Sequence, residues 1–429
     1  MDYGEKNILV LGAGSSGIGA AWVLAQLHAN VVLNDYKPVE FESSTRKKLD
    51  DAGVTIITGR QDNSLLNGVD RIVISPGIAL SIPIVQEAFN RHIEVVSEVE
   101  LAYDVCKSPI LGVTGTNGKT TTTTLLTQVM ESTGLPIKVG GNIGDSLSEA
   151  AFNMPEGGYL IAELSSYQLE TIKSFCPLGA IVLNVTPDHL ARHKTMENYA
   201  AAKARIFMNQ NAENFVVLND DDPIVAAMKK DVHSKILSIS QHHKVECGAY
   251  FEGNTCYAVL NGNVISVIDT EQIHIKGAHN IENILSVIAL TYALGVDVER
   301  IKRTIENFHG VEHRLERVTT IHDVTFYNDS KATNTDSVVK ALDAFDKPVI
   351  LLAGGHDKMT PLEDFMNVVK KNTKEVIFMG EAAERFESVA TKVGVTNIHR
   401  AQSMKEAVEL GYKLAEPSDI VLLSPACSS

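Results

Sequence analysis

The sequence is 429 residues long, which is more than one hydrophobic core can hold, so length predicts two or three domains, and we expect three. A composition of 44% hydrophobic and 21% charged residues is typical of a globular enzyme and excludes a disordered chain. The formal net charge of -15 argues against a nucleic-acid-binding or anionic membrane surface, and no segment reaches the roughly 18 apolar residues that span a bilayer. The five cysteines show no C-x-x-C pair, so we expect reduced thiols in a cytoplasmic protein.

The first glycine-rich stretch, ILVLGAGSSG, places Gly12, Gly14 and Gly17 at the G-x-G-x-x-G spacing of a dinucleotide-binding loop. Asp35 follows at nearly the distance expected of an acid that binds the ribose of NAD. Another diphosphate-containing ligand would satisfy the same loop, so the ligand stays open at this point. The apolar runs NILVLGAG, NVVLND, VTIITG and RIVISPG predict a parallel α/β unit over residues 1–107.

The second glycine-rich stretch, GVTGTNGKTTTTTLL at residues 112–126, follows an apolar run and opens a helical pattern. This context predicts a phosphate-binding loop, in which Lys119 reaches the β- and γ-phosphates and the Thr120 hydroxyl binds Mg²⁺. The spacing departs from G-x-x-x-x-G-K-[ST], because Val113 stands at the first glycine position and Gly115 follows two residues later. The alternative is a strand-to-helix turn with an exposed lysine.

The segments GYLIAELSS, GAIVLNVTPDH, NFVVLND and KILSIS have the continuous apolar character of buried parallel strands. Glu163 and His189 end two of these runs, so they are candidates for metal or substrate contacts, with loop hydrogen bonds as the alternative. Alternating residues over 249–277 and the Asn261-Gly262 pair predict an antiparallel hairpin, and helices are expected over 281–294 and 297–308.

The last part of the chain again contains apolar runs that predict parallel strands, PVILLAGG, EVIFMG and IVLLSPA. The helical stretches LEDFMNVVKK and MKEAVELGYKLA separate them. We therefore predict an α/β protein of three domains. These are a Rossmann-like N-terminal domain over 1–107, a central P-loop ATPase-type parallel sheet with a small antiparallel part over 108–312, and a C-terminal Rossmann-like domain over 313–429.

The motifs GTNGKTT, AELSSYQLE, NVTPDHL, AAKARI, HNIEN, GVEHR, NDSKATN, GGHDK and LLSPACSS occur in the order seen in the Mur ligases, which the whole chain resembles. The stretches GAGSSG and SPGIALSIP resemble the members that join D-glutamate to UDP-N-acetylmuramoyl-L-alanine. The resemblance implies an ADP-forming ligase of peptidoglycan precursor synthesis that forms an acyl phosphate. It also implies ATP, two Mg²⁺ ions, small-molecule substrates, a monomer, and a UDP-sugar loop in place of an NAD site.

Carried over motif by motif, the resemblance implies four sets of site residues. The ATP contacts are Gly115, Thr116, Asn117, Gly118, Lys119, Thr120, Thr121, Asn283, Arg314 and Asp329. The UDP-sugar contacts are Gly14, Ser15, Ser16, Gly17, Asp35, Tyr36, Lys37, Ser75, Pro76, Gly77, Asn142 and His189. The metal contacts are Thr120, Glu163, His189 and Lys203, and the amino-acid contacts are Lys331, Thr333, Lys358 and Ser429. The expected catalytic residues are Lys119, His189, Lys203 and Lys358.

Lys203 lies in the helical stretch ENYAAAKARIF, and residue type alone predicts a solvated helix lysine. The resemblance instead implies that CO₂ carbamylates it, which replaces an ammonium with the anionic oxygens that Mg²⁺ prefers. Two departures from the family stand out. Ala191 stands where the family commonly has Asp, and the chain stops at Ser429 where relatives continue through a final helix, which indicates a truncated chain.

Three rival functions remain at this stage. The first is a ligase of the same fold for another amino acid, although the DNPR-type motif of a diaminopimelate-adding relative is absent. The second is an NAD-dependent dehydrogenase. The third is a P-loop module that uses ATP only to switch conformation.

Overall fold

The computed structural model describes residues 2–275, 277–357 and 361–427, and the chain divides into two compact units. The first unit comprises Met1–Val185, His189–Thr270 and Glu282–Ile305, and the second comprises Thr186–Asp188, Glu271–Ile281 and Glu306–Ser429. Three separate sheets form the framework, two in the first unit and one in the second. The predicted α/β class with three mainly parallel sheets is therefore confirmed, while the predicted domain boundaries stay a prediction.

The N-terminal sheet has five parallel strands in the order β3-β2-β1-β4-β5. Its elements are β1 (Asn7–Leu11), α1 (Ser15–Gln26), β2 (Asn30–Asp35), α2 (Ser43–Asp51), β3 (Thr55–Thr58), β4 (Arg71–Ile74), α3 (Pro83–Asn90) and β5 (Glu94–Ser97). Alternate β1 residues belong to two apolar clusters, Val10 to one and Leu9 and Leu11 to the other, because both faces of the sheet are covered. Ligands of such sheets bind beyond the strand ends where the order reverses, here between β1 and β4.

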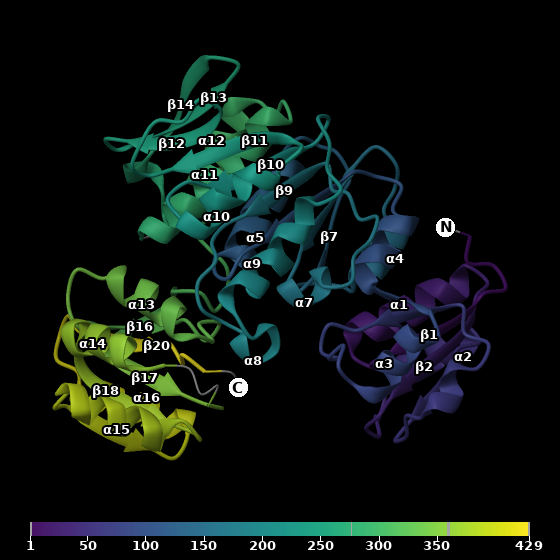
Figure 1. The fold of residues 1–429 in the computed structure, drawn as a ribbon. Helices are drawn as coiled ribbons and strands as arrows, with labels where there is room; N and C mark the ends of the chain where they lie inside the picture. Colours follow the sequence, from purple (N-terminus) through teal and green to yellow (C-terminus); the bar gives the residue numbers. More distant parts are fainter. Residues whose placement is uncertain (1, 276, 358–360, 428–429) are drawn as a thin grey trace. The chain divides into compact units, whose positions relative to one another are not determined.

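The central sheet has nine strands in the order β14-β13-β12-β11-β10-β9-β6-β8-β7. Figure 1 labels β7 and β9 to β14 of this sheet. Its strands are β6 (Ile110–Thr114), β7 (Ile137–Gly141), β8 (Tyr159–Glu163), β9 (Gly179–Val182), β10 (Phe215–Asn219), β11 (Lys235–Ser240), β12 (Gly248–Glu252), β13 (Thr255–Leu260) and β14 (Asn263–Asp269). The helices of this part of the sequence are α4 (Glu98–Val105), α5 (Lys119–Glu131), α6 (Leu147–Phe152), α7 (Ser166–Leu169), α8 (Leu190–His193), α9 (Met196–Ala204) and α10 (Pro223–Ala227). They are followed by α11 (Ala278–Ala293) and α12 (Val298–Glu306), near the two helices expected from the sequence.

The antiparallel part of the central sheet is confirmed and is continuous with the parallel part. β12 pairs parallel with β11 and antiparallel with β13, and β13 pairs antiparallel with β14. Asn261 and Gly262 have φ values of 53° and 80° in the turn between β13 and β14. Both residues need the left-handed region in the tightest hairpin turn, which is why this pair predicted the hairpin correctly.

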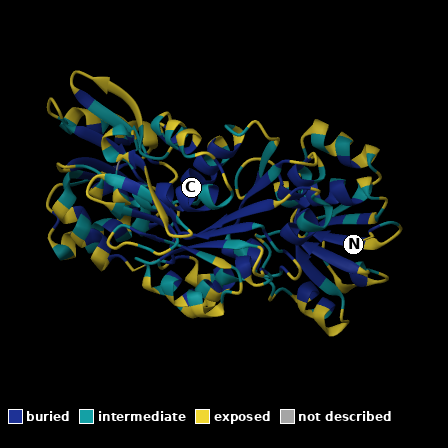
Figure 2. Ribbon diagram, turned by 90° about the horizontal axis from the view of Figure 1, so that it is seen from above, coloured by how far each residue is buried: buried dark blue, intermediate teal, exposed yellow. Residues whose placement is uncertain are grey.

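The sheet of the second unit has six strands in the order β15-β16-β20-β17-β18-β19. Its elements are β15 (Glu316–Ile321), β16 (Val324–Asn328), α13 (Thr335–Asp343), β17 (Val349–Gly354), α14 (Glu363–Asn372), β18 (Thr373–Met379), α15 (Ala383–Val393), β19 (Ile398–Ala401), α16 (Met404–Leu414) and β20 (Ile420–Leu423). The sequence analysis did not predict β15, β16 or β19. β15 is polar and almost wholly exposed, so it lacks the apolar run that marks the buried strands, which are dark blue in Figure 2.

Helix α1 of the N-terminal sheet packs against α6 of the central part within the first unit. A Cβ atom on Gly19 would lie 1.8 Å from the Ser146 Oγ and 2.5 Å from the Ser146 Cβ, so the Ser146 side chain packs directly against the α1 backbone. The Trp22 ring meets Phe152 edge to face with 5.7 Å between the ring centroids.

Within residues 2–275, 277–357 and 361–427, the structure contains no helix that is long and apolar enough to cross a membrane.

The substitution Gly19→Ala tests this close approach. Alanine normally stabilises a helix interior relative to glycine, so a loss of stability would come from the clash with the side chains of Ser146 and Glu149. We expect a loss of about 1–3 kcal/mol, read from urea unfolding by the fluorescence of Trp22, the single tryptophan of the sequence. Gly77→Ala is the control, because no atom lies within 4 Å of a Cβ there. Equal unfolding midpoints for Gly19→Ala and the wild type would contradict the close packing.

Candidate functional site

The loop between β6 and α5 has the backbone of a phosphate-binding loop. Gly115 and Gly118 have φ values of 156° and 83°, and α5 begins directly after Gly118. Asn184 holds the loop in place: its Oδ1 accepts the Asn117 N–H at 2.8 Å, and its backbone carbonyl accepts the Thr116 N–H at 2.9 Å. The loop is therefore formed before a ligand binds. The sequence analysis missed Asn184, whose only signal is its place at the end of the run GAIVLN.

Two lysines converge on one carbonyl oxygen of this loop. The Lys119 Nζ donates to the oxygens of Gly115 and Thr116 at 2.9 and 2.7 Å. The Lys203 Nζ, from α9, donates to the same Gly115 oxygen at 2.6 Å and lies 4.6 Å from the centre of the Tyr199 ring. Lys203 is only 1% exposed, so the solvated helix lysine expected from residue type is wrong. The fold therefore brings together the two lysines that the resemblance singled out.

The first turns of α5 lie beneath Asn283 of α11. A Cβ atom on Gly118 would lie 2.3 Å from the Asn283 Oδ1, which also accepts a hydrogen bond from the Thr122 hydroxyl at 3.1 Å. Thr120 and Thr121 are buried in the same turn. Only glycine at position 118 leaves room for this asparagine, so the loop and α11 form one surface.

Glu163, at the end of β8, is a fully buried carboxylate. Its Oε1 accepts the Asn142 amide N–H at 2.7 Å, whereas its Oε2 has no hydrogen-bond partner among the described residues. A buried carboxylate oxygen in this state requires a cation or a proton. Mg²⁺ fits, because it prefers carboxylate oxygens and completes its shell with hydroxyl, phosphate and water oxygens. The described residues hold no cluster of three or more His, Cys, Asp or Glu side chains that would form an all-protein metal cage.

His189 precedes the short helix α8 in a left-handed backbone conformation with φ of 55°. Its ring lies 4.9 Å from that of Tyr167 and 6.4 Å from that of Tyr199, between centroids. The hydroxyls of Tyr199 and Thr116 are 3.2 Å apart, so Tyr199 connects this aromatic group to the phosphate loop. Sequence reasoning predicted His189 and missed Tyr199, which had no motif of its own. At the unusual Ala191, the backbone carbonyl accepts a hydrogen bond from the Lys194 Nζ at 2.7 Å.

The G-x-G-x-x-G loop lies at the end of β1, beside the ends of β2 and β4. Asp35 accepts the backbone N–H groups of Ala13 and Lys37, each at 2.9 Å, so both of its oxygens stabilise the loop itself. The Ser75 hydroxyl donates to the Gly12 carbonyl at 3.2 Å. Gly17 is buried, and a Cβ atom there would lie 1.8 Å from the Gly12 carbonyl oxygen, so it permits the tight turn and is not exposed to a ligand. The remaining predicted residues at the ends of these three strands are exposed or partly exposed: Gly14, Ser15, Ser16, Tyr36, Lys37, Pro76 and Gly77. The ends of β1, β2 and β4 thus present one accessible loop group.

Asp329 follows β16 in the second unit. Its two oxygens accept the Leu315 backbone N–H at 3.2 Å and the Ser424 hydroxyl at 2.7 Å, and burial raises the pKa of Asp329 to about 6. Lys331 is exposed and Thr333 is partly buried in the loop that follows. The predicted residues Lys358 and Ser429 lie outside the described residues.

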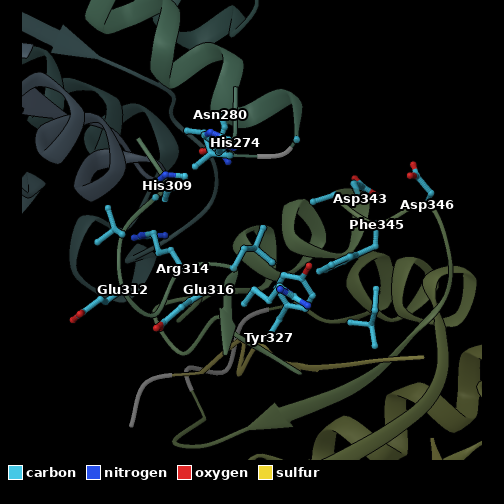
Figure 3. Close-up of a pocket in the computed structure, with 18 of the residues that line it drawn as sticks. His274, Asn280, His309, Glu312, Arg314, Glu316, Tyr327, Asp343, Phe345 and Asp346 are labelled. Carbon is cyan, nitrogen blue, oxygen red and sulfur yellow. The ribbon is translucent and has the colours of Figure 1, made fainter. Parts of the chain in front are cut away.

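The second unit also contains a cavity of about 1070 Å³, shown in Figure 3. Arg314, predicted from the sequence, lines it together with Asn280, His309 and Tyr327, which were not predicted. The rings of His274 and His309 stack in its wall with 4.3 Å between their centroids. Its volume is that of a small-molecule site, and its lining combines aromatic rings with a guanidinium.

The chain matches three family descriptions that together span most of its length. The N-terminal domain of MurD-like Mur ligases matches residues 6–97, the Mur ligase middle domain matches 113–291, and the Mur ligase glutamate ligase domain matches 313–427. A relative from Thermoanaerobacter pseudethanolicus is 41% identical over 431 residues, and one from Clostridioides difficile is 38% identical over 434 residues. Each alignment covers 100% of this chain and 95% of the relative.

The chain therefore belongs to the Mur ligase family, the ATP- and Mg²⁺-dependent ligases of peptidoglycan precursor synthesis. Both relatives are named UDP-N-acetylmuramoylalanine--D-glutamate ligase. Among solved structures, MurF from Acinetobacter baumannii has the same fold, with a TM-score of 0.64 at 16% identity over 97% of this chain and 90% of that one. A pseudomurein peptide ligase type C from Methanothermus fervidus gives 0.61 at 19% identity, over 97% and 96% of the two chains.

The raised pKa of Asp329 makes stability depend on pH. Between about pH 4 and pH 6 the folded chain keeps this proton and the unfolded chain releases it. The stabilising contribution is therefore complete below about pH 4 and is lost as the pH rises to about 6. The stability of the wild type relative to D329N should fall by up to about 3 kcal/mol across this window, since one pKa unit is worth about 1.4 kcal/mol. Urea unfolding of both proteins at pH 4.5, 5.5 and 7.5 measures this, and a constant difference would contradict the raised pKa.

Proposed function

We propose that this chain joins D-glutamate to UDP-N-acetylmuramoyl-L-alanine in the cytoplasm, with conversion of ATP to ADP and phosphate. The observation that carries the proposal is the 41% identity over the full chain to a relative named for this ligation. The phosphate loop with its two lysines and the unpartnered oxygen of Glu163 supply a matching site. We expect a monomer that acts on small molecules only.

In this proposal the loops at the ends of β1, β2 and β4 bind the UDP-sugar. The start of α1 offers free backbone N–H groups and the positive end of a helix dipole to the diphosphate. Asp35 accepts the N–H groups of Ala13 and Lys37, which fixes the loop, and each of its oxygens can still accept a hydrogen bond from a sugar hydroxyl. The dehydrogenase alternative is weakened instead by the 41% identity over the full chain to a relative named for a ligation. Residues 1–107 would then form the UDP-sugar domain, 108–312 the ATP domain and 313–429 the amino-acid domain.

The reaction begins with two anions, the alanine carboxylate and the γ-phosphate, which repel each other. Joining a carboxylate to an amine in water is uphill, so the carboxylate oxygen must first take the phosphoryl group and release ADP. Lys119 carries the charge that offsets this repulsion, once it leaves the carbonyls of Gly115 and Thr116 for the phosphates. The D-glutamate amine then attacks the acyl phosphate carbonyl, and phosphate leaves.

The metal ligands in this proposal are Thr120, Glu163, His189 and Lys203, and two Mg²⁺ ions would neutralise phosphate charge when bound. Lys203 can contribute only as a carbamate, because an ammonium has no lone pair. The convergence of Lys119 and Lys203 on the Gly115 oxygen supports this proposal, because a carbamate on Lys203 would replace a positive charge beside Lys119 with a negative one. We assign the ribose, adenine and phosphate contacts to Asp329, Asn283 and Arg314, and D-glutamate to Lys331, Thr333, Lys358 and Ser429.

The decisive assay is phosphate release from ATP in the presence of UDP-N-acetylmuramoyl-L-alanine, with each candidate amino acid supplied in turn. We expect release with D-glutamate and none with L-alanine or diaminopimelate. Lys119→Ala should lose more than a hundred-fold in kcat, because Lys119 carries the charge that faces the γ-phosphate. Its Trp22-monitored unfolding should stay close to that of the wild type, because Lys119 is a partly exposed residue at the start of α5 and contributes little packing. Release with a different amino acid, or without a UDP-sugar, would favour the other ligases or the ATP switch.

Lys203→Ala tests the carbamate separately. We expect a loss of most of the activity, with partial recovery in acetate, whose carboxylate can occupy the vacated oxygen-ligand position. Lys230→Ala, which replaces an exposed lysine, is the matched control. It should keep the wild-type activity, and acetate should not alter that activity. Full activity of Lys203→Ala, or a ¹³C spectrum of the active enzyme without a carbamate signal in ¹³CO₂, would exclude this role.

A further inference from the structure

Arg192 connects the loop after β4 to the central part of the first unit. It lies in α8, three residues after His189. Its guanidinium donates from Nη1 to the Pro76 carbonyl and from Nη2 to the Ile78 carbonyl, each at 3.0 Å. The loop that it holds contains Ser75, Pro76 and Gly77, which we assign to the UDP-sugar.

Glu170 fixes the guanidinium from the opposite side. The Arg192 Nε lies 3.1 and 3.2 Å from the two Glu170 oxygens, and Nη2 lies 2.5 Å from Oε2. The guanidinium also stacks on Tyr167, 4.4 Å from the ring centre. The two charged side chains are only 18% and 16% exposed, so this pair is screened far less than a surface ion pair. Arg192 therefore has one well-defined orientation.

The contacts continue from Glu170 toward Glu163. The Glu170 Oε1 lies 3.6 Å from the His193 Nδ1, and the His193 Nε2 lies 3.0 Å from the Ser166 Oγ. Burial lowers the pKa of His193, so the ring favours its neutral form. Ser166 begins α7, three residues after Glu163. A continuous set of polar contacts thus runs from the loop after β4 to the strand end that bears the candidate metal carboxylate.

We propose that Arg192 is a positioning residue for the ligation: it holds the loop of residues 75–78 at a fixed place relative to His189 and Glu163. The inference rests on the proposed function. A UDP-sugar bound at the ends of β1, β2 and β4 must deliver its carboxylate to the phosphate loop of a different sheet. A displacement of about 1 Å in such an alignment is enough to lower the rate substantially. Arg192 limits movement of the loop of residues 75–78 relative to the central part of the first unit, because it contacts both the loop and Glu170.

Lysine cannot replace arginine in this role. The fork of the guanidinium reaches two carbonyls and one carboxylate in fixed directions, whereas an ammonium is a single point charge. The contacts therefore predict that Arg192→Lys keeps a positive charge beside Glu170 but loses the hydrogen bonds to the carbonyls of Pro76 and Ile78. A residue needed only for charge neutralisation would tolerate this change.

The test compares wild type, Arg192→Lys, Arg192→Ala and the control Arg91→Ala. Arg91 also pairs with a glutamate, Glu87 at 2.7 Å, and contacts Asn67 at 3.2 Å, but it lies on the surface of α3 and its loop. For both Arg192 variants we expect the KM for UDP-N-acetylmuramoyl-L-alanine to rise about ten-fold or more, with the KM for ATP within two-fold of the wild type. Millimolar guanidinium should partly restore Arg192→Ala, and Arg91→Ala should match the wild type.

Hydrogen exchange provides a readout that does not depend on turnover. The amides of residues 75–82 should exchange at least ten-fold faster in the two Arg192 variants and at the wild-type rate in Arg91→Ala. An unchanged KM for the UDP-sugar, unchanged exchange in this loop, or parallel losses in both KM values without guanidinium rescue would overturn the positioning role. Wild-type protein without turnover on the UDP-sugar would instead overturn the proposed function, even if the exchange result stands.

Discussion

The Gly115 carbonyl is the contact on which the candidate site depends. Lys119 from α5 and Lys203 from α9 both donate to this one oxygen, although Lys203 lies 88 residues from Gly115 in the sequence. Two positive charges this close repel each other, and burial of Lys203 limits the solvent that could screen them. The loop thus concentrates positive charge at the start of α5, which is the kind of environment that attracts an anionic phosphate group. Asn184 keeps the backbone in this state by bonding Thr116 and Asn117.

A second constraint joins the N-terminal sheet to the central sheet. Helix α4 follows β5 directly and places two buried carboxylates in its first turn. Glu98 accepts the Ser148 N–H and hydroxyl at 3.0 and 2.9 Å, and burial raises its pKa. Glu100 accepts the N–H groups of Lys173 and Ser174 at 2.8 and 2.5 Å. Together with the α1–α6 contact and the Arg192 hydrogen bonds, these bonds connect the N-terminal part of the first unit to its central part.

The HNIEN motif on α11 is divided between the two units. Asn280 belongs to the second unit and lines its cavity, whereas Asn283 belongs to the first and lies against Gly118. Residues 186–188, just before His189, also belong to the second unit, where the Thr186 hydroxyl donates to Asp336 at 3.0 Å. The chain therefore passes from one unit to the other next to residues of the candidate site.

The sequence by itself determined the α/β class, the three mainly parallel sheets, the hairpin at Asn261-Gly262 and the glycine-rich turn from β6 into α5, because each of these follows from local apolar runs, glycines and one helix start. It did not reveal β15, whose exposed residues carry no apolar pattern, nor Asn184 and Tyr199, which act on residues that are distant in the sequence. The sequence also did not predict the burial of Lys203, because lysine is usually exposed. The packing of α9 against the loop between β6 and α5 removes this side chain from water. The same holds for Arg192: its motif is local, but the carbonyls that give it a role lie 116 and 114 residues away, and only the tertiary structure brings them within hydrogen-bond distance.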